Sequence, residues 1–395
     1  MWRADSFLAL PEDVIAFAWS APMRDLAARV DISDVGLKKL LRSQGIPTPP
    51  QGHWNRVHAR RKVDEPPCPM PRGPGGNGRT TLDSRFRDHV PVTGPLSEEG
   101  PFATIRVPEH LSDLRRQEIA AFGRVVVPKD LSRPSPGLAR LLKSEAARRD
   151  KMASSRWQWD EPRFDTPLGR RQLHILNGLF RALERRGHKC DAWEDNHELR
   201  GRCTIGDETL SLRFGILGRH STELRSGYHR PARDLPSTTA ITLGLDRTLR
   251  EPLTTSWTDV ADSPIEKRLG EVCADLVVAA EASFRQSLVE ARERQEERLR
   301  WEEERRQTRL RELSGKRMAD LERSGDLLRR AEEIRALVSR VESAMLKGSL
   351  LDVTSERISG WKSWALDQAD RIDPVLSGQV MDHLHVAELD DDDFQ

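Results

Sequence analysis

Basic side chains are concentrated in one stretch of this 395-residue sequence, between Gly36 and Lys62. The stretch contains seven Lys or Arg residues and no Asp or Glu, although the whole chain has a formal net charge of only +1. Cations that no nearby acid neutralises bind polyanions well, because each phosphate contact releases condensed counterions. The stretch therefore predicts a surface for phosphate groups.

The residues around the start of this stretch have the spacing of two short helices joined by a tight turn, which is a helix-turn-helix pattern. The apolar residues expected to pack the two helices together are Leu26, Ala27, Val30, Ile32, Leu37 and Leu40. Asp31 occupies the turn, where Asp tolerates a left-handed backbone, and Ser33 is placed to cap the second helix. A preceding helix in PEDVIAFAW, residues 11–19, completes a predicted three-helix head.

The second helix of the pattern, expected from Ser33 to Ser43, is the one that would read DNA. Side chains near the start of such a helix suit base edges, and later basic ones suit phosphates, so we expect Asp34 and Lys38 to contact bases. The expected DNA contacts on this helix are Ser33, Asp34, Lys38, Lys39 and Arg42. The alternative is a small helical bundle whose lysines are only solvated.

A proline-stiffened turn after Gly45 leads into a basic arm. The arm supplies the remaining expected DNA contacts, which are His53, Arg56, Arg60, Arg61 and Lys62. Such an arm lies along the DNA backbone or enters a minor groove, and it strengthens binding with little sequence preference. Trp54 has the alternative role of packing back on the head.

Two other groups of residues carry atoms that could hold a metal ion. The zinc-type ligands are His188, Cys190, His197 and Cys203. They lack the two-to-four-residue ligand spacing of structural zinc sites. The carboxylates of a possible metal-dependent nuclease are Glu198, Asp207 and Glu208. No lysine follows them at the spacing such sites use, and no phosphate-loop or hydrolase motif is present, so we expect no cofactor, metal or catalytic residue.

Composition divides the chain into six expected segments. Residues 63–101 are rich in Pro, Gly, Arg and Ser with few apolar residues, which predicts a disordered tether. VPEHLS at Val107 and VPKDLS at Val127 predict two short strands that lead into helices. The expected segments are the helix-turn-helix head and arm at 1–62, the linker at 63–101, a strand and helix segment at 102–155, an α+β domain at 156–262, a long charged helix at 263–347, and a terminal helix with an acidic tail at 348–395.

The middle domain is expected to combine one helix with an antiparallel sheet. The helix should run from Thr166 to Arg186 and end at Gly187. HELRGRCTI and ETLSLRFGIL alternate around a Gly206-Asp207 turn, and TTAITLGL resembles a third strand. The predicted fold class is therefore α+β and predominantly helical.

A long helix is predicted from Ser263, which can cap it. Its first part should pack on the middle domain through Leu269, Val272, Leu276, Ala279 and Phe284. Farther along, apolar residues recur every eleven positions at Val277, Leu288, Leu299, Leu310 and Leu321. Glu to Arg pairs four residues apart support a solvated helix. Two outcomes are open, a dimeric coiled coil that makes a homodimer, or a rod that breaks at Ser314-Gly315 and Ser324-Gly325 and folds back through Asp326–Met345.

The C-terminal part is predicted to form one amphipathic helix, with Trp361 and Trp364 as packing residues, that stops before Pro374. The acidic end ELDDDDFQ either keeps the chain in solution or competes with DNA for the basic arm. A protein partner would bind the long charged helix or this acidic tail. Four widely separated cysteines and no secretory signal favour a cytoplasmic or nucleoid location. Apolar runs are too short for a membrane span.

Four stretches together resemble a group of uncharacterised bacterial proteins with an N-terminal helix-turn-helix. They are DISDVGLKKLLRSQGIPTPPQGHW, LNGLFRALERRGHKC, the charged helix and WKSWALDQADRIDP, and the resemblance covers most of the chain. The junction from Gly45 to Trp54 is its most specific part, with His53 where members tend to have an aromatic residue. The resemblance implies binding of double-stranded DNA and brings no known reaction.

The function expected from the sequence is therefore that of a DNA-binding regulator, or of an accessory factor of a mobile or defence locus. The alternatives are a nuclease that uses the middle domain and a structural adaptor whose head binds protein.

Overall fold

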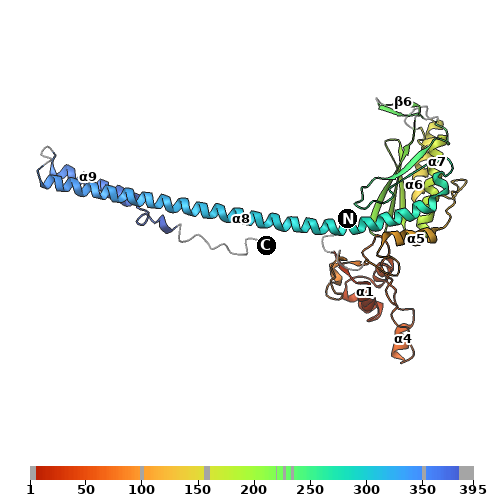
Figure 1. The fold of residues 1–395 in the computed structure, drawn as a ribbon. Coiled ribbons are helices and arrows are strands. Elements are labelled where there is room, and N and C mark those ends of the chain that lie inside the picture. Colours follow the sequence, from red (N-terminus) through yellow and green to blue (C-terminus); the bar gives the residue numbers. More distant parts are fainter. Residues whose placement is uncertain are drawn as a thin grey trace. The chain divides into compact units, whose positions relative to one another are not determined.

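The computed structural model describes residues 6–97, 102–154, 161–218, 220–225, 228–232, 235–348 and 353–381. The chain is an α+β protein that divides into two compact units, Met1–Arg292 and Glu293–Gln395 (Figure 1). The long helix α8 (Leu269–Leu346) begins in the first unit and ends in the second. Among the residues described, none of the helices has both the length and the apolar character that crossing a membrane requires.

The first elements of the chain form an N-terminal module, defined here as residues 6–97. Its strand β1 (Ser6–Ala9) is followed by α1 (Pro11–Ala18), α2 (Met23–Arg29) and α3 (Asp34–Ser43). Pro11 starts α1 at a position where a missing N–H costs nothing. The three helices lie where the sequence predicted them, and their apolar faces share one core.

The segment expected to be a disordered tether is instead part of this module. Strand β2 (Thr80–Asp83) pairs antiparallel with β1, and a short 3₁₀ helix, Ser84–Phe86, follows it. Leu82, Phe86 and Val90 are buried in the core, where the Phe86 ring meets Phe17 edge to face. The tether prediction was wrong because three well-placed apolar residues suffice when a preformed core receives them.

Two helices connect the module to the middle domain. They are α5 (Leu111–Phe122) and α6 (Pro136–Ser154). The short strands expected at Val107 and Val127 do not form, because neither residue lies in a strand. Val107 is nevertheless fully buried.

The middle domain contains a five-stranded antiparallel sheet in the order β3-β4-β5-β8-β9. The strands are β3 (Lys189–Asp195), β4 (Glu198–Ile205), β5 (Glu208–Ile216), β8 (Ile241–Leu245) and β9 (Ser256–Thr258). Helix α7 (Pro167–Arg185), capped by Thr166, lies across one face (Figure 1). There Gly201 of β4 lies against Leu176 and Phe180 of α7. A separate hairpin pairs β6 (Thr222–Arg225) with β7 (Tyr228–Pro231).

The same sheet face also packs on the start of α8, which follows a short 3₁₀ helix, Ile265–Lys267. The residues predicted to make this contact are all buried, namely Leu269, Val272, Leu276, Ala279 and Phe284. The predicted contact is confirmed for Leu269, Val272, Leu276 and Ala279, which belong to the core of the middle domain, whereas Phe284 packs under the guanidinium of Arg72. The start of α8 is therefore a core helix, unlike its charged continuation.

A buried carboxylate on α8, that of Glu281, binds the segment of the N-terminal module that precedes β2. Both oxygens of Glu281 accept hydrogen bonds from Arg72, at 2.7 and 3.0 Å. The Gly75 N–H donates to Glu281 at 2.8 Å, and the Arg285 Nε donates at 2.8 Å. Arg72 also donates to the Phe102 carbonyl at 2.8 Å. We call the contacts of Glu281 with Arg72 and Gly75 the Glu281 clamp.

Next to the clamp, the backbone of Gly75 contacts the β4–β5 turn. Asp207 N–H donates to the Gly75 carbonyl at 2.8 Å, and the Asp207 carboxylate accepts from the Asn77 N–H at 2.8 Å. Gly75 and Gly206 both have positive φ, and a Cβ on Gly206 would lie 2.4 Å from the Gly75 carbonyl carbon. Both positions therefore require glycine.

The second unit contains the remainder of α8 and a partner helix, α9 (Ser355–Ile372). Helix α8 continues through Gly315 and Gly325, so the predicted breaks and the fold-back of Asp326–Met345 are wrong. The helix that packs against α8 is α9, and Arg335 of α8 pairs with Asp370 of α9 and with Asp373, the residue that follows α9.

The exposure of the apolar side chains in this unit differs from one residue to another. Trp364 is 61% exposed, so it is not a packing residue, whereas Trp361 is half-buried. Leu299, Leu310 and Leu321 are exposed along α8, and the homodimer through this helix stays a prediction. The acidic tail lies outside the described residues.

Replacing Phe86 by alanine should destabilise the N-terminal module by about 3–5 kcal/mol, because a fully buried ring is removed. Hydrogen exchange of peptides from β1 and α1 measures this loss. Val92→Ala, at an exposed position, is the matched control and should leave exchange at the wild-type rate. Unchanged exchange in Phe86→Ala would mean that the segment is a tether after all.

Removing the carboxylate of the Glu281 clamp should lower the stability of the folded chain. We expect Glu281→Ala to lower the free energy of unfolding by about 3–5 kcal/mol, because Arg72 is then buried without its counter-ion. Glu271→Ala, which removes a surface pair between the first turn of α8 and Arg268 just before it, should lower the free energy of unfolding by less than about 1 kcal/mol. Urea denaturation compares them, and equal losses would contradict the role given to the clamp.

Candidate nucleic-acid interface

The turn between α2 and α3 has the geometry that its residues predict. Asp31 adopts φ 50°, and the Ile32 N–H donates to the Ala27 carbonyl at 3.1 Å. The Ser33 Oγ accepts from the Gly36 N–H at 3.0 Å and so caps α3. These contacts fix where α3 begins and in which direction it runs.

The rotation of α3 about its axis is fixed by two leucines. Leu37 and Leu41 are fully buried in the core of the N-terminal module. Leu40, which was predicted to lie on the inner face, is only half-buried. On a helix with 3.6 residues per turn, Leu41 lies closer to the direction of Leu37 than Leu40 does. The opposite face of α3 is therefore the one presented to solvent.

That solvent face carries the predicted DNA-contacting side chains. Ser33, Asp34, Lys38, Lys39 and Arg42 are all exposed. Within the described part of the chain, the three cations of this set form no ion pair. Asp34 Oδ1 accepts from the Val35 N–H at 2.8 Å, which orders the first turn. The charges of α3 are thus available to a ligand.

The predicted arm is folded rather than extended over its first half. Residues His53–His58 form α4, which starts after Gly52 with φ 77°. His53 is only 5% exposed and its ring meets Trp19 and Trp54 edge to face, with centroids 5.2 and 5.1 Å apart. His53 is therefore a packing residue, and its prediction as a DNA contact was wrong. The alternative reading of Trp54 as a packing residue fits its half-buried position.

The second half of the arm keeps its charge. Arg56 pairs with Asp64 at 2.8 Å, so an acid just beyond the basic stretch neutralises it. Arg60, Arg61 and Lys62 are exposed, and none of them forms an ion pair within the described residues. We call residues 60–62 the basic segment. The predicted contacts that the structure leaves open to a ligand are thus on α3 and in the basic segment.

The zinc-type residues do not converge. Cys190 and Cys203 face each other across β3 and β4 with 3.8 Å between their Sγ atoms. The contact with Cys190 and burial raise the pKa of the Cys203 thiol well above its usual value. His197 instead receives a hydrogen bond from Arg163. No three His, Cys, Asp or Glu side chains of the described residues are grouped so that they could hold a metal ion.

The carboxylates of the nuclease alternative have structural partners. Asp207 binds the Asn77 N–H as described above. Glu208 accepts a hydrogen bond from Arg247 at 3.0 Å, and Glu198 lies 3.2 Å from Arg200. Each carboxylate therefore stabilises a turn or a strand.

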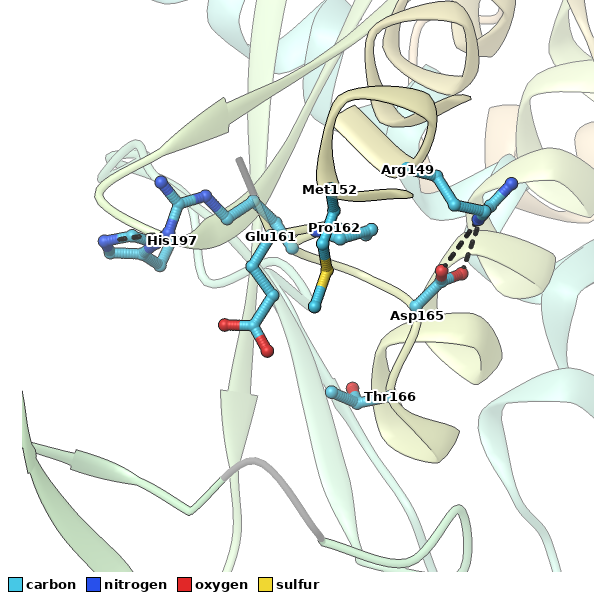
Figure 2. A pocket seen from close by; sticks show the side chains of 8 residues that line it. Arg149, Met152, Glu161, Pro162, Asp165, Thr166 and His197 are labelled. Carbon is cyan, nitrogen blue, oxygen red and sulfur yellow. Dashed lines mark hydrogen bonds and ion pairs between the residues drawn. The ribbon is translucent and has the colours of Figure 1, made fainter. Parts of the chain in front are cut away.

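A cavity of about 390 Å³ lies between the end of α6, the start of α7 and the β3–β4 turn. Its lining is Arg149, Met152, Glu161, Pro162, Arg163, Asp165, Thr166 and His197 (Figure 2). Arg149 donates to both oxygens of Asp165, at 2.8 and 3.0 Å, and this hydrogen bonding lowers the pKa of Asp165. Sequence patterns do not predict this cavity, because its residues come from three separate segments. Its guanidinium groups bind other lining residues, so we assign it no ligand.

Comparisons with known proteins gave no match for this chain among family models, curated proteins or solved structures.

One half-buried histidine, His188, should make stability depend on pH. Burial, with Arg186 nearby, lowers the pKa of His188 from 6.5 to about 4. Between these values the unfolded chain binds a proton that the folded chain does not, so stability is complete above pH 6.5 and falls as the pH drops toward 4. Urea denaturation across this range should show a shallower decline for His188→Asn. An unchanged decline would contradict the assignment to His188.

Proposed function

We propose that the N-terminal module binds duplex DNA through α3, with the basic segment Arg60–Lys62 contacting the phosphate backbone. The observation that carries this proposal is the solvent face of α3, whose exposed cations have no ion-pair partner within the described residues. In this proposal α2, the turn and α3 act as a helix-turn-helix with α3 as the recognition helix.

The dimensions of α3 support this role. Its ten residues span about 15 Å, and a major groove about 12 Å wide admits a single helix. Ser33 and Asp34, at its start, are placed for base edges, and the Ser33 hydroxyl keeps a hydrogen to donate while its oxygen caps the helix. Lys38, Lys39 and Arg42 follow within two turns, where they can reach bases or phosphates.

The basic segment adds an attraction that depends little on sequence. Three consecutive cations beyond α4 can each neutralise a phosphate, and each such contact steepens the dependence of affinity on salt. Packing of His53 on Trp19 fixes α4 to the end of α1, so the segment that follows has an anchored origin. We propose that the contact of the basic segment with phosphates orients the module on the duplex and does not read bases.

The biological role that fits these features is that of a DNA-binding regulator, or of an accessory factor in a mobile or defence locus. The rest of the chain, including the exposed side of α8, would then be available to bind a protein partner. A metal-dependent nuclease has less support, because the carboxylates considered for it are bound to other groups of the protein.

Mobility-shift titration of the full chain against random-sequence duplex, at two salt concentrations, tests the proposal. We expect salt-dependent binding, and replacing Lys38, Arg42, Arg60 and Arg61 together by alanine should weaken it. The slope of log affinity against log salt should fall by about one for each phosphate contact removed.

A matched variant separates this surface from net charge. Arg140, Lys143, Lys151 and Arg181 are also exposed, so their replacement by alanine removes the same four charges from α6 and α7. This control should bind as the wild type does. Equal weakening of both variants, or no binding by the wild type, would refute the proposed interface.

A further inference from the structure

We infer that Val35 contacts the C5-methyl group of a thymine in the major groove, and that the N-terminal module therefore prefers thymine at one position of its site. This inference rests on the proposed binding of DNA by α3. It adds a base-reading residue that carries no charge and no hydrogen-bonding group.

Val35 has no role in the core of the module. It is 72% exposed, the highest value among the large apolar side chains of the module's described residues. A β-branched side chain at an exposed helical position is also less favourable for the helix than alanine or lysine. Folding therefore gives no reason for valine at this position.

The geometry of α3 places Val35 beside the cations of the proposed interface. It is the second residue of α3, directly after Asp34, and the Ser33 cap fixes the course of this first turn. Residues three and four positions apart share a helix face, so Val35 lies on the same side as Lys38 and Lys39. A ligand held by these two lysines is within reach of the valine methyl groups.

The charge of Asp34 indicates which part of DNA meets this turn. A carboxylate is repelled by phosphates, whereas the base edges of the major groove include amino groups that it can accept from. The start of α3 is therefore suited to bases rather than to the backbone. Among the four bases, only thymine presents a methyl group there, and an apolar side chain such as that of Val35 is its natural contact.

Replacing thymine by uracil tests this contact, because it removes the methyl group and leaves the hydrogen-bonding atoms in place. Duplexes are first enriched from a random-sequence pool with the full chain, and each thymine of the enriched site is then replaced singly by deoxyuridine. At one position, uracil should weaken wild-type binding about fourfold, the effect expected for one buried methyl group. Val35→Ala, whose shorter side chain has two methyl groups fewer, should discriminate less between the two duplexes than the wild type does.

Val92→Ala is the matched control, since Val92 is another exposed valine of the module, and it should keep the preference for thymine. Wild-type protein that binds thymine and uracil duplexes equally at every position would overturn the inference. Salt-dependent binding without any enriched sequence would also overturn it, while leaving the proposed DNA binding intact. An absence of binding to any duplex would overturn both.

Discussion

The carboxylate of Glu281 holds the segment before β2 against α8 and the β4–β5 turn. It is fully buried on α8, and it is bound by Arg72, Gly75 and Arg285. A buried charge is costly unless hydrogen bonds and a counter-ion satisfy it, so losing Arg72 would leave Glu281 strongly destabilised. Because Arg72 and Gly75 lie between the basic segment and β2, the clamp links the N-terminal module to the core of the middle domain.

This link gives the candidate interface a fixed orientation. A cationic helix on a disordered tether would sample many orientations, whereas here β2 returns to β1 and Phe86 enters the same core as the helices. Leu37 and Leu41 in turn fix which face of α3 is exposed. The polar face of α3 is therefore supported by residues up to fifty positions away, and a fragment that stopped at Lys62 would lack part of that support.

Local signals in the sequence were enough for the elements that depend on them. Ser33, Thr166 and the Gly206-Asp207 turn correctly located α3, α7 and the β4–β5 hairpin, because capping and turn chemistry act over a few residues. Features made by distant partners were missed. Strand β2 pairs with residues more than seventy positions earlier, and α9 rather than Asp326–Met345 packs on α8. Strand β3 was missed for a local reason, because it is mostly charged although it pairs with the adjacent β4. For the candidate site, the exposed cations of α3 were identified, but the packing of His53 on Trp19 could not be read from spacing.

The central claim, that α3 and the basic segment form one DNA-binding surface, is tested most directly by chemical footprinting of lysines. The full chain is acetylated with and without duplex DNA, and the modification of each lysine is measured by mass spectrometry. We expect DNA to protect Lys38, Lys39 and Lys62, and to leave Lys143, Lys151 and Lys267, which are also exposed, unprotected. Protection of the second set alone, or of neither set in the presence of excess DNA, would contradict the account.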